Sequence, residues 1–195
     1  KTFAPGLYDL TELQRDANKK FGFSAKETLN IMQRLYENHK VLTYPRTDSR
    51  YIGKDVAETL KERLKACGVG PYRKIVGKLT VQPIRVNKSF VDDSKVSDHH
   101  AIIPTEQFVQ LEYMTSDERK IYDLVVRRFA AVLYPPCEYE QTTLKGICGG
   151  EIFTAKGRRM KQPGWQAAYE DIVEDEAEDD IREQLLPEMK EGMTE

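Results

Sequence analysis

A tyrosine followed closely by two arginines is the feature of this chain best suited to chemistry. Tyr44 precedes Arg46 and Arg50, between a short apolar run and a polar segment. A phenol oxygen can attack a phosphodiester and bond to phosphorus, while guanidinium groups neutralise the phosphate and favour the phenolate. The same spacing also fits a turn with a partly buried tyrosine and surface arginines. Residue types alone leave both interpretations open.

Helical patterns surround this tyrosine. Capping residues and apolar periodicity predict four helices, which start near residues 9, 24, 54 and 115. Their predicted ends are Gly22, His39, Gly68 and Pro135. A residue before proline avoids helical backbone angles, so Tyr44, followed by Pro45, is expected on an extended loop after the second helix.

β-prone residues follow the last predicted helix. Runs at 139–147 and 151–155 flank Gly149-Gly150, which predicts a hairpin. A third strand is expected to carry Trp165 and to end near Tyr169, and segment 68–97 has no clear pattern. The predicted fold class is α+β. A mainly helical domain, 10–133, is inserted into or abuts a small antiparallel β-rich portion made of 1–9 and 134–195.

Two strings resemble the signatures of a known enzyme family. Residues 43–51 read Thr-Tyr-Pro-Arg-Thr-Asp-Ser-Arg-Tyr, and residues 98–105 read Asp-His-His-Ala-Ile-Ile-Pro-Thr. The first resembles the active-site motif of type IA DNA topoisomerases, in the bacterial topoisomerase III branch. The second resembles another signature of that family and follows in the expected order. Weaker similarity covers nearly the whole chain. The resemblance implies a helical domain that bears the catalytic tyrosine and is inserted into a β-rich gate domain.

The resemblance implies a role for three residues of the candidate site. Tyr44 would be the nucleophile and would form a 5′-phosphotyrosine. Arg46 would contact the scissile phosphate, for which a guanidinium offers bidentate geometry. His99 would help to position the cleaved phosphate, and either histidine of the motif could assist in acid–base work.

Other residues are candidate DNA contacts. They are Lys40, Arg50 and His100. Arg50 could equally pair with Asp48 or Glu37, and Thr47 is expected to shape its own loop through local hydrogen bonds. Backbone contacts and base stacking could also come from a further set of residues, although an ordinary solvated surface is the favoured interpretation for each one: Lys19-Lys20, Arg73-Lys74, Arg127-Arg128, Arg158-Arg159, Tyr36, Tyr51 and Tyr72.

The net charge of −2 hides an uneven distribution. Residues 170–195 hold 12 acids and two bases, so residues 1–169 hold 28 bases and 20 acids. A basic body suits a polyanionic partner, because phosphate contacts supply most non-specific affinity for nucleic acid. The acid-rich stretch at 170–184 is expected to be a solvated loop or weak helix.

Several classes of site are not expected. The three cysteines form no Cys-x-x-Cys pair, which argues against a zinc ribbon or a disulfide framework, and the His99-His100 pair has no further ligands nearby in sequence. No apolar run approaches the ~20 residues of a membrane span. The widely spaced cysteines are expected to be reduced thiols in the cytoplasm, and the resemblance implies a bacterial protein associated with nucleoid or plasmid. Type IA enzymes also need a Toprim domain whose acids bind Mg²⁺, and no such pattern occurs here. Mg²⁺ is therefore expected outside this chain.

These observations favour the central fragment of a DNA topoisomerase. The parent enzyme would cleave one strand, pass another strand and reseal, whereas the fragment alone is expected to be nearly inactive. Its partner would be DNA, preferentially single-stranded, bound by a monomer. The alternative is a non-catalytic single-stranded-DNA-binding module on the same scaffold. A tyrosine recombinase or relaxase is disfavoured because Tyr44 precedes His99, the reverse of the recombinase order.

Overall fold

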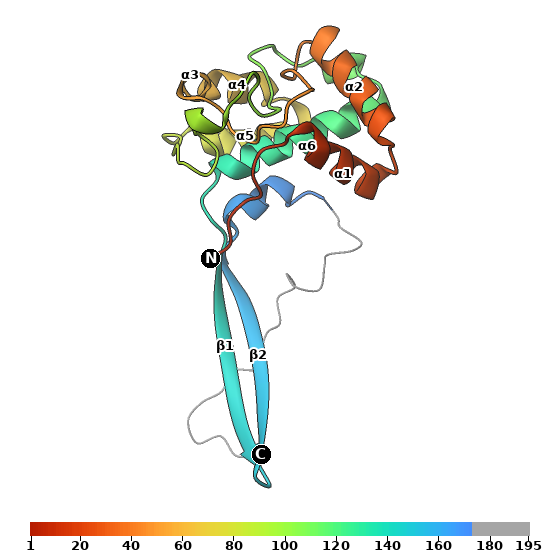
Figure 1. Ribbon diagram of the computed structural model, residues 1–195. Helices are drawn as coiled ribbons and strands as arrows, with labels where there is room; N and C mark the ends of the chain where they lie inside the picture. Colours follow the sequence, from red (N-terminus) through yellow and green to blue (C-terminus); the bar gives the residue numbers. More distant parts are fainter. Residues whose placement is uncertain (173–195) are drawn as a thin grey trace.

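A helical unit and a long two-stranded hairpin make up this protein. The computed structural model describes residues 1–172, with the side chain of Cys148 left aside. The hairpin projects from one end of the helical unit, and the N-terminus lies at the neck between them (Figure 1). The mixture of helices and an antiparallel pair of strands confirms the predicted α+β class. None of the described helices is long and apolar enough to cross a membrane.

The first two helices begin at the capping residues that the sequence indicated. The side chain of Asp9 accepts a hydrogen bond from the Glu12 amide at the start of α1 (Leu10–Phe21). Gly22 ends that helix with a φ of 72°, a conformation in which a side chain would be strained. A complete capping box precedes α2 (Ala25–Glu37). These bonds satisfy amides that have no partner within the helix.

The third predicted helix is divided in two. α3 (Lys54–Glu58) and α4 (Leu60–Cys67) meet at Thr59, whose hydroxyl donates to the Val56 carbonyl and accepts from Arg63 Nε. Because such side-chain bonds compete with the backbone hydrogen bonds of a helix, the helix is interrupted at Thr59.

The segment without a clear pattern contains a helix that the sequence did not indicate. α5 (Arg73–Thr80) directly follows the short 3-10 helix η1 (Gly70–Tyr72), whose proline obscured the pattern. Its buried residues Ile75, Val76 and Leu79 join the common core. Two further 3-10 turns, η2 (Asp93–Lys95) and η3 (Leu111–Tyr113), lie in the connecting loops.

The longest helix, α6 (Ser116–Leu133), is the centre of the helical unit. It contacts α1, α2 and α5, and Tyr122 and Phe129 are fully buried on it. The predicted capping box of Thr115 and Glu118 is present at its start. The single core cluster runs through all these helices, so the loops between them are held by buried apolar contacts.

The hairpin is longer than the sequence indicated, and the predicted third strand is wrong. β1 (Glu138–Cys148) pairs antiparallel with β2 (Glu151–Gln162), and Gly149 and Gly150 form the turn with φ values of 59° and 88°. The chain then forms the 3-10 helix η4 (Gly164–Tyr169) instead of a strand. Gly164 has a φ of 51°, and a Cβ there would lie 2.3 Å from the Pro136 carbonyl oxygen. This close approach turns the chain back onto the helical unit.

Two adjacent arginines of α6 stabilise the neck, where the N-terminal segment and the segment after the hairpin pack on the helical unit. Arg127 donates to the Ala168 carbonyl at 2.8 Å and pairs with Asp171 at 2.6 Å. Arg128 donates to the Gly6 carbonyl at 3.1 Å and pairs with Asp16 at 2.7 Å. Their interpretation as DNA contacts is therefore wrong, because both guanidinium groups are buried in these bonds. The predicted acidic stretch at 170–184 lies mostly outside the described residues.

Candidate active site

The tyrosine loop leaves α2 through a left-handed residue. Lys40 has a φ of 57°, and no other non-glycine residue between 1 and 172 has a positive φ. The Thr105 hydroxyl donates to the Lys40 carbonyl at 2.6 Å and holds this corner. Val41 and Leu42 then enter the core, and Tyr44 follows partly buried at its edge. Tyr44 lies outside any helix or strand, after the end of α2, in agreement with the loop that the following Pro45 predicted.

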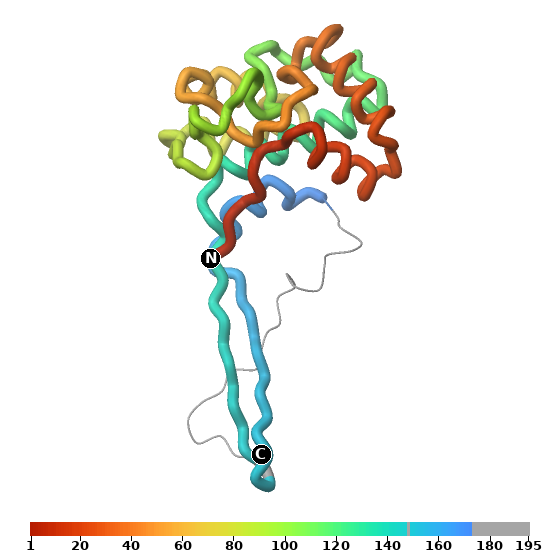
Figure 2. Tube along the Cα trace, in the orientation of Figure 1, coloured from red at the N-terminus to blue at the C-terminus, as the bar shows by residue number. Residues whose placement is uncertain are grey.

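The histidine motif runs antiparallel beside the tyrosine loop. Leu42 pairs with Pro104, and the Thr43 amide donates to the Ile103 carbonyl at 3.0 Å. The Thr105 amide donates to the Val41 carbonyl at 3.0 Å. In the chain trace, the tyrosine loop is drawn in orange and the histidine motif in green, and both lie within the helical unit (Figure 2). The two sequence motifs therefore share one short stretch of paired backbone.

This pairing places the Tyr44 and His99 rings against each other. Their centroids are 4.2 Å apart with an angle of 34° between the planes. The Tyr36 ring contacts Tyr44 edge-on at 5.5 Å and is itself exposed. Within the described residues the Tyr44 hydroxyl has no hydrogen-bond partner, so none of their groups competes with a ligand for this oxygen.

Two cationic side chains near the tyrosine are exposed. Neither the Arg46 guanidinium nor the Lys40 ammonium has an ion pair or hydrogen bond within the part of the chain that the structure describes. Arg46 follows Tyr44 by two residues on the same loop, and its side chain is exposed.

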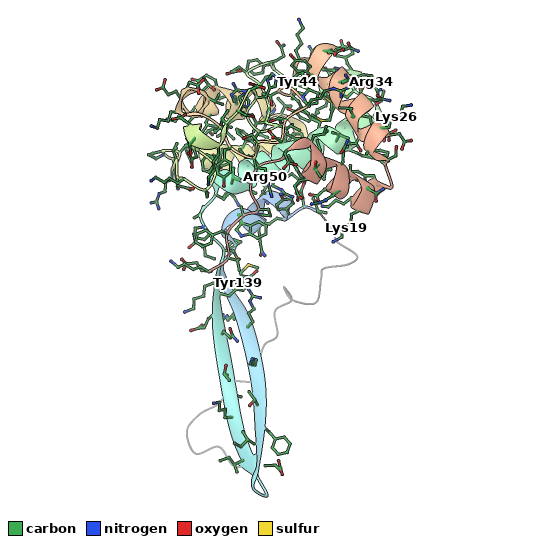
Figure 3. The ribbon with its side chains drawn as sticks, viewed as in Figure 1. Lys19, Lys26, Arg34, Tyr44, Arg50 and Tyr139 are labelled. Carbon is green, nitrogen blue, oxygen red and sulfur yellow. The ribbon has the colours of Figure 1, made fainter. Side chains whose placement is uncertain are left out.

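Arg50 lies elsewhere. Its Nε donates to the Leu7 carbonyl at 3.1 Å, and it pairs with neither Asp48 nor Glu37. In Figure 3, Tyr44 lies near the top of the helical unit, whereas Arg50 lies closer to the neck. The structure thus separates Arg50 from the tyrosine, in spite of their proximity in the sequence.

His100 has different surroundings from His99. It is partly buried, and its Nδ1 lies 2.7 Å from the Ala101 carbonyl oxygen, whereas His99 is exposed. Burial lowers the pKa of His100, and the nearby Arg63 charge adds to this effect against the opposing hydrogen bond to Ala101. Buried Arg63 also donates to the Pro104 carbonyl at 2.9 Å and pairs with Glu106 at 2.8 Å. His100 therefore favours the neutral form and is part of the support of the motif.

A buried carboxylate supports the base of the tyrosine loop. Glu118 accepts from Arg34 Nε at 2.8 Å and lies 3.1 Å from His39 Nε2, in addition to its bond from the Thr115 amide. Burial raises the pKa of Glu118, but the hydrogen bonds from Thr115, Arg34 and His39 outweigh it and lower the pKa overall. The sequence indicated Glu118 only as a helix cap. Its contacts with Arg34 and His39 join segments that are far apart in the sequence, so no local pattern indicates them.

The remaining candidates for DNA contact differ in accessibility. Tyr72 is buried and cannot stack on a base, and Tyr51 carries the Lys95 ammonium 4.4 Å from its ring centroid. Arg158 packs over the Tyr139 ring at 3.7 Å, and Lys19 lies far from Tyr44 in Figure 3. Of the three tyrosines considered for stacking, Tyr36 therefore combines exposure with contact to Tyr44.

No metal site is found among residues 1–172. No three His, Cys, Asp or Glu side chains converge there in a way that could hold a metal ion. The residues described do not fit the magnesium ion that the family resemblance implies.

Comparison with known proteins identifies the family. A family profile described as DNA topoisomerase matches residues 1–194. The chain belongs to the DNA topoisomerase family. It is 65% identical over all of its 195 residues to DNA topoisomerase 3 of Bacillus thuringiensis strain Al Hakam, and 53% identical over 194 residues to that of Bacillus subtilis strain 168. These names confirm the resemblance to the topoisomerase III branch.

A solved topoisomerase structure agrees in fold. Full-length topoisomerase I from Thermotoga maritima superposes with a TM-score of 0.62 at 26% identity, over 95% of this chain and 30% of that protein. The chain spans 27% of the length of each of the two Bacillus relatives.

Proposed function

We propose that this chain is the tyrosine-bearing part of a type IA DNA topoisomerase that cleaves one DNA strand through Tyr44. The observation that carries the proposal is the pairing of Tyr44 with His99, 4.2 Å apart, with the tyrosine hydroxyl and the Arg46 guanidinium both unpaired within residues 1–172. A nucleophile and an imidazole that can hydrogen-bond to a phosphate are thus in contact, and a cation follows two residues later on the same loop.

The proposed step is a transesterification. The Tyr44 oxygen bonds to phosphorus, the P–O3′ bond breaks, and the leaving 3′ oxygen takes up a proton while the phenol loses one. The downstream strand then carries a 5′-phosphotyrosine. Arg46 neutralises charge on the phosphate, and His99 orients the cleaved phosphate. Because one ester replaces another, the strand can be resealed by the reverse reaction. The step as written uses residues of this chain only.

The proposed substrate is single-stranded DNA. The exposed Tyr36 ring beside Tyr44 could stack on a base, and Lys40 and Arg46 could contact successive phosphates. An extended single strand fits such side chains because its bases are free to stack. We propose that the parent protein binds this strand as a monomer in the bacterial cytoplasm and takes its Mg²⁺ outside the described residues.

The test is covalent trapping by the full-length parent enzyme. A single-stranded oligonucleotide labelled at its 3′ end is incubated with enzyme and Mg²⁺, quenched with detergent and separated on a denaturing gel. The label should migrate with the protein, whereas a 5′-end label should be released on a shortened strand. Tyr44→Phe should form no adduct and should still bind the oligonucleotide, because the phenyl ring retains the packing on His99.

Three results would count against parts of this proposal. An adduct formed by Tyr44→Phe would remove Tyr44 from the reaction. Binding of the oligonucleotide without any adduct from the unsubstituted enzyme would favour the alternative of a non-catalytic DNA-binding module. A protein-bound 5′-end label would reverse the proposed polarity of the linkage.

A further inference from the structure

Two threonine hydroxyls connect the tyrosine loop to the histidine motif, one on each side of Tyr44-Pro45-Arg46. The Thr43 hydroxyl donates to the Ala101 carbonyl at 3.2 Å and accepts from the Ile103 amide at 3.0 Å. The Thr47 hydroxyl donates to the His99 carbonyl at 3.0 Å and accepts from the Ser49 amide at 3.1 Å. Each hydroxyl therefore uses its donor and its acceptor capacity.

These bonds cross the region where backbone pairing stops. Backbone bonds join the two motifs at Thr43 and Ile103, and again where the Ala101 amide donates to the Tyr51 carbonyl at 2.9 Å. Between these places, no backbone hydrogen bond in the described part of the chain joins residues 44–46 to residues 98–100. The ring contact of Tyr44 with His99 lies in this gap. The Thr47 bond reaches the His99 backbone itself, so it restrains the residue that carries the ring.

Burial and a backbone hydrogen bond also hold Thr47 in place. It is buried, at 8% exposure, and its carbonyl accepts from the Leu10 amide at 3.1 Å, which ties the loop to the start of α1. A buried carbonyl that loses its donor is left without a hydrogen bond, which is unfavourable away from water. The His99 carbonyl is therefore expected to move if the Thr47 hydroxyl is removed.

We propose that Thr43 and Thr47 are positioning residues, which hold the Tyr44 ring against His99 in the geometry required for strand cleavage. This inference rests on the proposed function of Tyr44. Neither threonine touches the reacting phosphate in this scheme. Their hydroxyls act through the backbone of the histidine motif, whereas DNA affinity depends on the exposed cations.

Positioning by the threonines and DNA binding by the exposed cations predict different effects on the rate of adduct formation and on DNA affinity. Displacing a reacting group by ~1 Å can lower a rate by about 100-fold. Removal of either hydroxyl should therefore slow adduct formation at saturating DNA by about 10-fold or more while the Kd for the oligonucleotide changes by about twofold or less. A residue needed only for folding would lower the amount of active enzyme without changing the rate of the molecules that fold.

The experiment uses the full-length parent enzyme with isosteric pairs. Thr43→Val and Thr47→Val remove the hydroxyl and keep the shape, and Thr43→Ser and Thr47→Ser retain a hydroxyl. Thr28→Val is the matched control, because Thr28 is fully buried and its hydroxyl donates within α2 to the Ser24 carbonyl at 3.0 Å. For each variant, the rate of adduct formation is measured at saturating oligonucleotide and corrected for active enzyme by titration. Kd is measured by fluorescence anisotropy.

We expect slow adduct formation in the valine variants and recovery of most of the adduct-forming rate in the serine variants. The rate in Thr28→Val should equal that of the unsubstituted enzyme. If Thr47→Val does not fold, Thr47→Cys replaces it, and its weakly donating thiol should give an intermediate rate. Rates equal to that of the unsubstituted enzyme in folded Val or Cys variants would overturn the proposal. The function proposed for Tyr44 would survive that result, since its own test is an adduct formed by the unsubstituted enzyme and absent from Tyr44→Phe.

Discussion

The His99 ring lies 4.2 Å from the Tyr44 ring in a tilted stack, and the two residues come from different sequence motifs. A stacked imidazole presents its face, not a ring nitrogen, to the phenol. Its nitrogens are thus left at the edge of the stack, where a phosphate held at the Tyr44 oxygen could accept a hydrogen bond. This geometry favours phosphate positioning by His99 over direct proton abstraction from Tyr44.

Replacement of His99 separates stacking from hydrogen bonding. His99→Phe keeps an aromatic ring on Tyr44 but has no nitrogen, and we expect adduct formation to slow by about 10-fold or more, since a hydrogen bond to a charged group contributes about 1.5–3 kcal/mol. His99→Ala should be at least as slow. The rate of adduct formation at saturating oligonucleotide is the measurement. A normal rate in the Phe variant would assign His99 a packing role only.

Replacement of Arg46 tests the phosphate contact. Arg46→Lys keeps the charge but not the bidentate geometry, so we expect slower cleavage with nearly unchanged binding, whereas Arg46→Ala should also weaken binding and reduce its salt dependence. Adduct rate and Kd over a series of salt concentrations are measured together. Arg85→Ala is the control, because Arg85 is exposed and lines a cavity at the neck. Equal effects of Arg46→Ala and Arg85→Ala would indicate general charge attraction.

Two substitutions of Lys40 separate the effect of its backbone conformation on stability from the effect of its charge on DNA binding. A residue with a side chain at a φ of 57° is strained by about 1 kcal/mol relative to glycine, so Lys40→Gly should be about 1 kcal/mol more stable than Lys40→Ala. Urea unfolding of the two variants measures this difference. Both lack the ammonium group, so both should lose the same amount of DNA affinity. Equal stability of the pair would show that the corner is not strained.

The buried carboxylate makes stability depend on pH. The folded pKa of Glu118 lies below its usual value of 4.5, so the folded form binds this proton less readily than the unfolded chain. The stabilisation is present above pH 4.5 and is lost as the pH falls below it. Glu118→Gln should destabilise the protein by about 2 kcal/mol at pH 7, and the difference should narrow below about pH 4.

Unfolding by urea between pH 3.5 and pH 7 measures this effect. Glu112→Gln is the control, because Glu112 is exposed and has no partner among residues 1–172. A constant difference between Glu118→Gln and the unsubstituted chain over this pH range would contradict a lowered pKa.

Local features of the sequence determined much of this protein. The capping residues Asp9, Ser24 and Thr115 mark the starts of three helices, and Gly149-Gly150 forms the hairpin turn. These features depend on a few neighbouring residues, because a cap or a turn satisfies its hydrogen bonds within the same segment. The order of the tyrosine and histidine motifs was likewise sufficient to indicate the family that the comparisons confirm.

Tertiary structure decided which of the candidate residues meet. Arg50 is near Tyr44 in the sequence, yet it bonds to the Leu7 carbonyl, and Arg127 and Arg128 are buried in the neck although basic pairs usually lie on the surface. The stack of Tyr44 on His99 and the Thr47 bond beneath it join segments that are distant in the chain. Such contacts depend on how the core packs, and no local pattern encodes a hydrogen bond whose partner is supplied by another segment.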